Sequence, residues 1–77
     1  MTEEEKQEIR KIIKGLEEGK LKLICKPDEW YDEGTEVECL SAFTEESWLG
    51  DGLFRGLKDG KIDEEMCGFD EFEVVSL

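Results

Sequence analysis

The spacing of apolar residues changes near residue 19, from the repeat of a helix to that of strands. In the first part, Thr2 and Glu5 form the Thr-x-x-Glu pattern of a capping box, and Gly19 suits the position just after a helix. Between them, apolar residues recur at i, i+3, i+4 and i+7: Ile9, Ile12, Ile13 and Leu16. This spacing places them on one helical face. We therefore predict a helix over residues 3–18.

Residues 20–77 show the alternation and turn signals of antiparallel strands. Asp59-Gly60 lies between two apolar-bearing runs and predicts a hairpin, because a type I′ turn needs positive φ at both central positions. Gly56, inside the preceding run, indicates a bulge or a close backbone approach. The predicted strands are 20–26, 35–43, 53–58, a short strand that includes Ile62, Met66 and Cys67, and 73–77.

These elements predict one α+β domain over residues 1–77. An N-terminal amphipathic helix (1–19) packs on a small, strongly bent antiparallel sheet of four to five strands (20–77). The predicted core consists of Ile9, Ile12, Ile13, Leu16, Leu21, Leu23, Val37, Phe43, Phe54, Leu57, Phe69 and Val74. In the loop 28–34, adjacent Trp30 and Tyr31 cannot both point inward in extended chain, so one of them should be exposed.

The net charge of the chain is large and unevenly distributed. The chain carries a net charge of −12. Residues 1–26 have seven basic and six acidic side chains, a net of +1, whereas residues 27–77 have three basic and sixteen acidic, a net of −13. Such a field repels nucleic acid and anionic lipid and attracts basic surfaces. Solubility alone is the other explanation of this charge.

The composition disfavours an enzyme. Histidine is absent, which removes the usual general base and the commonest metal ligand. The run around Asp59-Gly60 resembles the middle of an EF-hand loop, but Arg55, Leu57 and Met66 stand where that loop needs oxygen ligands. We expect no catalytic residue, no metal site and no cofactor.

Cysteine usage and the absence of targeting signals predict a cytoplasmic protein. Cys25, Cys39 and Cys67 are an odd number at wide spacing, which excludes a fully paired disulfide framework and favours reduced thiols. No apolar run approaches the eighteen or so residues of a membrane span. The N-terminal residues lack the basic and apolar regions of a signal peptide.

The order of strands, the Asp-Gly hairpin and the turn Phe69-Asp70-Glu71-Phe72 before the terminal strand resemble SH3-like small β-barrels. The resemblance covers residues 20–77 and implies a 3₁₀ turn before the last strand and an aromatic groove for peptides. Trp30, Tyr31 and Trp48 would supply that groove. In size and charge the chain is also similar to small phage-encoded acidic inhibitors of the DNA-mimic or anti-CRISPR type.

Two hypotheses of function follow. In the first, a non-enzymatic binder covers a basic, nucleic-acid-binding site on a partner protein with carboxylates that replace phosphates. It contacts neither nucleic acid nor membrane directly. In the second, an SH3-like interaction module binds a protein or peptide, and the charge serves only solubility. The candidate partner-binding residues are Asp28, Glu29, Trp30, Tyr31, Asp32, Glu33, Glu36, Glu38, Glu45, Glu46 and Trp48.

Overall fold

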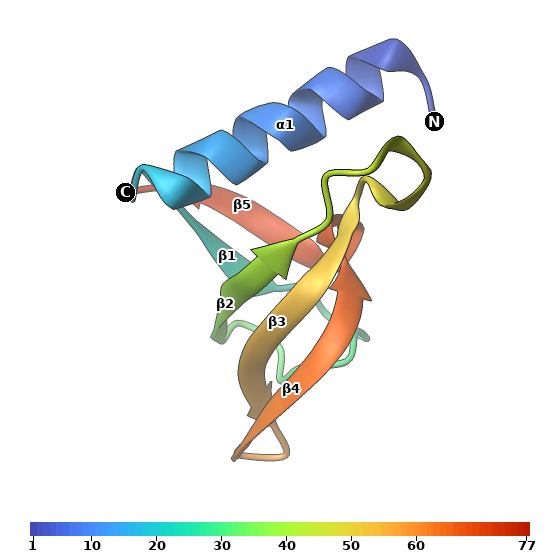
Figure 1. Ribbon diagram of the computed structural model, residues 1–77. Coiled ribbons are helices and arrows are strands. Elements are labelled where there is room, and N and C mark those ends of the chain that lie inside the picture. The colour runs from blue at the N-terminus through green and yellow to red at the C-terminus, as the bar shows by residue number, and fades with distance from the viewer.

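The computed structural model describes all 77 residues and shows one helix packed on a five-stranded antiparallel sheet (Figure 1). The helix precedes all strands, and two single 3₁₀ turns interrupt the sheet. In chain order the elements are α1 (Glu3–Glu17), β1 (Leu21–Cys25), β2 (Glu36–Ala42), η1 (Glu46–Trp48), β3 (Asp51–Lys58), β4 (Lys61–Gly68), η2 (Phe69–Glu71) and β5 (Phe72–Ser76). The predicted α+β class is confirmed.

The sheet has the order β4-β3-β2-β1-β5 and bends between β1 and β2. These two strands pair over only Leu23–Val37 and Ile24–Glu36, whereas β3 and β4 pair along their whole length. The sheet remains open, with β4 and β5 at its edges. This order, with η2 just before the last strand, is compatible with a small SH3-like barrel.

Helix α1 begins and ends where the sequence signals predict. The Thr2 Oγ1 accepts a hydrogen bond from the Glu5 N–H at 3.2 Å, and Glu5 Oε1 accepts one from the Thr2 N–H at 3.1 Å. Gly19 adopts φ +71° beyond its end. The helix lies across one end of the bent sheet (Figure 1), and its apolar stripe is half-buried against the core. The predicted packing of helix on sheet is therefore confirmed.

Aromatic rings fill the space between the two halves of the sheet. Phe54 is completely buried, and its ring meets Phe69 edge-on at 5.2 Å and Phe72 at 4.8 Å between centroids. The buried cluster comprises Leu23, Cys25, Tyr31, Val37, Phe54, Cys67, Phe69 and Phe72. Tyr31 and Phe72 were not among the predicted core residues. The sequence pattern placed Phe72 in the turn, but Phe72 begins β5 with its side chain inward.

Phe43 is not a core residue, because β2 contains a register shift. The shift lies between Cys39 and Ser41, where one extra residue turns the following side chains to the opposite face. Ala42 then packs against the core, and half-buried Phe43 lines a surface hollow instead. A strict alternation from Val37 had placed Phe43 inward.

Leu57 is also outside the core, with 37% of its surface exposed. In β3 the inward positions belong to Gly52, Phe54 and Gly56, so Leu57 faces solvent. A Cβ atom at Gly56 would lie 2.9 Å from Cδ1 of Tyr31. The sequence indicated either a bulge or a close approach at Gly56, and the structure shows a close approach of the Tyr31 ring. The irregularity of strand pairing lies in β2 instead.

The β3–β4 hairpin confirms the Asp-Gly signal. Asp59 has φ 52° and Gly60 has φ 77°, the positive values of a type I′ turn. Strand β4, predicted to be short, spans eight residues. The hairpin projects away from α1 (Figure 1).

Candidate functional site

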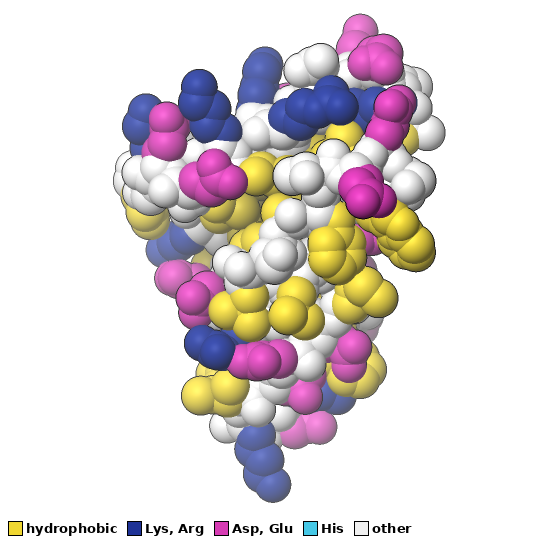
Figure 2. All heavy atoms as spheres, in the orientation of Figure 1, with side chains coloured by type: hydrophobic (Ala, Val, Ile, Leu, Met, Phe, Trp, Pro, Cys, Tyr) yellow, Lys and Arg dark blue, Asp and Glu magenta, His cyan; other side chains and the backbone are white.

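The side of β2, β3 and β4 that faces away from the core carries exposed apolar side chains, and we call it the outer face. The opposed pairs Leu53–Met66 and Leu57–Ile62 lie on it, and Arg55–Glu64 lies between them. Met66 is 57% exposed and Ile62 is 74% exposed. Figure 2 shows hydrophobic side chains gathered over these strands, with acidic side chains among them. Exposed apolar groups concentrated on one side of a small domain indicate an interaction surface.

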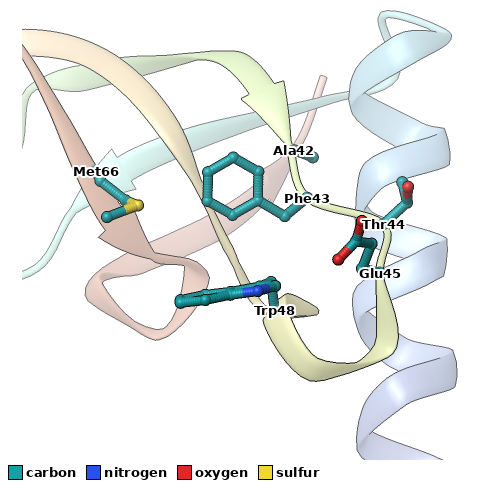
Figure 3. A pocket seen from close by; sticks show the side chains of 6 residues that line it. All are labelled: Ala42, Phe43, Thr44, Glu45, Trp48 and Met66. Atoms are coloured by element: carbon teal, nitrogen blue, oxygen red, sulfur yellow. The ribbon is translucent and has the colours of Figure 1, made fainter.

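A hollow of about 500 Å³ lies at the end of the outer face next to α1, and we call it the aromatic pocket. It lies between the β2–β3 connection and β4 (Figure 3), and its lining residues are Ala42, Phe43, Thr44, Glu45, Trp48 and Met66. The rings of Phe43 and Trp48 form adjacent walls, and Met66 closes the far side (Figure 3). Trp48 is 53% exposed. The pocket is mainly apolar and Glu45 is its only charged lining residue.

Contacts with α1 hold the connection that carries Trp48. Lys6 of the helix forms an ion pair with Glu46 of η1. This hydrogen bond lowers the pKa of the Glu46 carboxyl and raises that of the Lys6 ammonium. Leu49 is buried, and Gly50, the residue before β3, lies against the side chain of Ile9 in α1. The aromatic pocket therefore has a fixed wall on the side of the helix.

A second hollow of about 400 Å³ lies on the inner side of β4, and we call it the acidic hollow. Trp30 forms part of it, and its indole N–H donates to Asp63 Oδ2 at 2.8 Å. The Lys58 ammonium lies 3.8 Å from the centroid of the Trp30 ring, a cation–π contact. The remaining lining residues are Asp28, Glu29, Glu65, Met66, Cys67 and Glu71. With four carboxylates and one ammonium, this hollow favours a cationic ligand.

The predicted residues of the 28–34 loop have different structural roles. Trp30 is 41% exposed and Tyr31 is 3% exposed, so one of the two aromatics is exposed as expected. The Tyr31 hydroxyl donates to the Phe54 carbonyl at 2.9 Å, and burial raises its pKa to about 12. Tyr31 is thus a core residue and its ring lies away from the surface. The Asp32 carboxylate accepts hydrogen bonds from the N–H groups of Asp59 and Gly60, both at 2.8 Å, and so stabilises the hairpin turn.

The other predicted carboxylates divide into paired and unpaired groups. Glu38 lies 3.7 Å from the Arg55 guanidinium, and Glu46 contacts Lys6, so their charges are partly neutralised. Glu36 and Glu38 both point outward from β2, as their alternation with Val37 predicts. The predicted carboxylates without a cationic partner are Asp28, Glu29, Asp32, Glu33, Glu36 and Glu45, and of these Asp32 is bound to the N–H groups of the hairpin turn. Asp28 and Glu29 line the acidic hollow, whereas Glu36 and Glu45 lie on the outer side of the sheet.

Five apolar residues of this surface were not among the predicted binding residues: Phe43, Leu53, Leu57, Ile62 and Met66. Phe43 was assigned to the core because the register shift in β2 has no clear sequence signal. Alternation through β4 would have placed Met66 with Ile62 on the exposed side, because residues i and i+4 of a strand share a face.

The cysteines are free and not activated as nucleophiles. Burial raises the pKa of the Cys67 thiol to about 12 and also raises those of Cys25 and Cys39. A thiol acts through its thiolate, and such a shift keeps the thiolate scarce at neutral pH. No group of three or more potential ligands is arranged to hold a metal ion. Neither α1 nor the 3₁₀ turns have the length and apolar character needed to cross a bilayer.

Fold and surface together define a small α+β domain with an exposed apolar and acidic surface. No known protein family, curated protein or solved structure matches the chain.

Proposed function

We propose that this protein is a non-enzymatic interaction domain that binds a partner protein through the aromatic pocket. The observation that carries the proposal is the pocket itself, in which a half-exposed Trp48 stands beside Phe43 and Met66. Trp is enriched among the residues that contribute most to protein interfaces, and Met adapts its shape to apolar partners. An apolar side chain of the partner would enter between the two rings.

The charge of the chain specifies a basic partner. Glu45 lines the aromatic pocket and Glu36 lies on the same side of the sheet, and neither has a cationic neighbour within ion-pairing distance. Acidic groups around an apolar centre increase the rate of association with a basic surface, whereas the apolar centre determines how slowly the complex dissociates. The acidic charge would thus attract the partner, and Trp48 would slow its dissociation.

The second candidate is a narrower form of the first, in which the partner surface normally binds nucleic acid. The net charge of −13 over residues 27–77 supports it, because this density of carboxylates suits a site built for phosphates. The structural roles of Asp32, Glu38 and Glu46 reduce the number of free carboxylates and weigh against it. In this form the domain would compete with nucleic acid for its partner.

Affinity capture tests the proposal. Immobilised protein would be incubated with a lysate of the source cells, and bound proteins would be eluted with a salt gradient and quantified by mass spectrometry. Trp48→Ala removes the central ring of the pocket. Leu77→Ala serves as the matched control, because Leu77 is 75% exposed and follows β5 beside the C-terminal end of α1 (Figure 1).

We expect a basic protein that elutes at moderate salt, is lost with Trp48→Ala and is retained with Leu77→Ala. If that protein is a nucleic-acid enzyme and added DNA or RNA releases it, the second candidate is supported. Equal recovery by the wild type and Trp48→Ala would contradict the role of the aromatic pocket.

A further inference from the structure

Strand β4 has a free edge that no other element covers. It is an end strand of the sheet, paired with β3 alone. None of the backbone hydrogen bonds outside the regular elements involves residues 61–68. An edge strand with free N–H and C=O groups is a template for a further strand.

The hairpin register shows which groups point outward. Lys58 and Lys61 flank the two-residue type I′ turn and exchange both backbone hydrogen bonds, and such bonded pairs alternate along an antiparallel ladder. Asp63, Glu65 and Cys67 therefore bond to β3, and the backbone groups of Ile62, Glu64 and Met66 face the free edge. In agreement, the Met66 N–H donates to its neighbour's side chain, Glu65 Oε1, at 3.2 Å. From Ile62 to Met66 this edge is about 14 Å long.

The two hollows lie on opposite faces of this strand. Met66 belongs to the outer face and lines both hollows, whereas Glu65 and Cys67 are on the inner side and line the acidic hollow alone. Successive side chains of a strand point to opposite faces of a sheet. A strand added beside β4 would direct alternate side chains toward the aromatic pocket and the others toward the acidic hollow.

The charge of β4 selects the occupant. Asp63, Glu64 and Glu65 follow one another in the strand. A second copy of the chain added at this edge would bring these carboxylates next to identical ones, which is unfavourable. A segment with lysine or arginine on one side would instead meet four carboxylates of the acidic hollow: Asp28, Glu29, Glu65 and Glu71.

We propose that β4 accepts an extended segment of a partner protein as a sixth strand, with apolar side chains on one side and basic side chains on the other. The apolar side chains enter the aromatic pocket and the basic ones enter the acidic hollow. This inference rests on the proposed function and adds the mode of binding and the sequence pattern of the partner, a period-two alternation of apolar and basic residues.

The probe for the test is a nine-residue peptide of alternating lysine and valine with blocked ends, added to isotope-labelled full-length protein. Backbone amide exchange is measured by NMR at saturating peptide. The amides of Ile62, Glu64 and Met66 should exchange at least about tenfold more slowly, because they acquire a partner in the ladder. The amides of Asp63 and Glu65, already bonded to β3, serve as controls in the same strand and should change little.

Matched peptides separate strand addition from attraction by charge. N-methylation of the valines in one peptide, and of the lysines in another, removes the backbone donors along opposite edges of the segment. Only one of the two should lose binding, by at least about tenfold, because only one edge can face β4. A peptide of the same composition with its valines contiguous should bind more weakly than the alternating one.

Several results would overturn the inference. One is an absence of binding at millimolar peptide, and another is equal behaviour of the two methylated peptides. Chemical-shift changes at Trp48 without protection of Ile62, Glu64 and Met66 would reject strand addition and leave the pocket proposal in place. Loss of partner capture with Trp48→Ala tests that proposal separately. Sedimentation should show a monomer without peptide, and a dimer with the same protected amides would make a second copy the occupant.

Discussion

At the scale of single residues, the adjacent aromatics Trp30 and Tyr31 show how the fold assigns different roles to neighbours. Tyr31 points into the core, where Gly56 leaves space for its ring and the Phe54 carbonyl accepts a hydrogen bond from its hydroxyl. Trp30 points outward and contacts Lys58 and Asp63. The sequence predicted that one ring is exposed. Which one is exposed depends on Gly56, which lies far along the chain in β3.

The titration of Tyr31 tests this assignment directly, because it is the only tyrosine. Its phenol should ionise near pH 12 in the folded protein and near pH 10 in denaturant, as followed by absorbance at the tyrosinate band. Since the folded-state pKa is the higher, this group's contribution to stability is complete below pH 10 and is lost as the pH rises through 12. A midpoint near 10 in the native protein would show that Tyr31 is not buried.

At the scale of elements, local signals predict each unit and long-range contacts determine the exceptions. The capping box of α1 and the type I′ turn at Asp59-Gly60 involve residues close in sequence, so both could be predicted from the sequence alone. The register shift in β2 depends on pairing with β3, and no residue near it in the sequence indicates it. The same shift moves Phe43 to the surface, which is why the aromatic pocket could not be predicted together with the fold.

The helix and the sheet should contribute differently to stability. Leu23→Ala in β1 should lower the free energy of unfolding by about 3–5 kcal/mol, because Leu23 is completely buried. Ile12→Ala in α1 should lower it by about 1–2 kcal/mol, because Ile12 is half-buried against the core and loses less contact. Urea denaturation measures both. Costs of equal size would show that α1 is as tightly packed as the sheet.

At the scale of the whole molecule, the acidic charge and the apolar groups belong to the same part of the chain. Residues 27–77 have a net charge of −13, against +1 for residues 1–26, and they also contain both hollows. Composition alone predicted the charge imbalance. The structure adds that some carboxylates are used internally, such as Asp32 at the hairpin turn, so charge and binding surface are not the same set of residues.

In the proposed mode of binding, charge increases the rate of association and Trp48 slows dissociation. Binding kinetics of the captured partner test it at about 0.01 M and about 0.15 M ionic strength, where the screening length falls from about 30 Å to about 8 Å. The variants are Glu36→Lys with Glu38→Lys on β2 and Trp48→Ala in the pocket. Glu4→Lys with Glu8→Lys on α1 makes the same change of charge away from the outer face.

We expect the β2 pair to slow association by about tenfold at the lower ionic strength, with a smaller effect at the higher one and little change in dissociation. The α1 pair should have a smaller effect on association. Trp48→Ala should speed dissociation and leave the salt dependence nearly unchanged. If the β2 pair binds as fast as the wild type at low ionic strength, the charge serves only solubility, and if Trp48→Ala dissociates at the wild-type rate, the aromatic pocket is not the binding site.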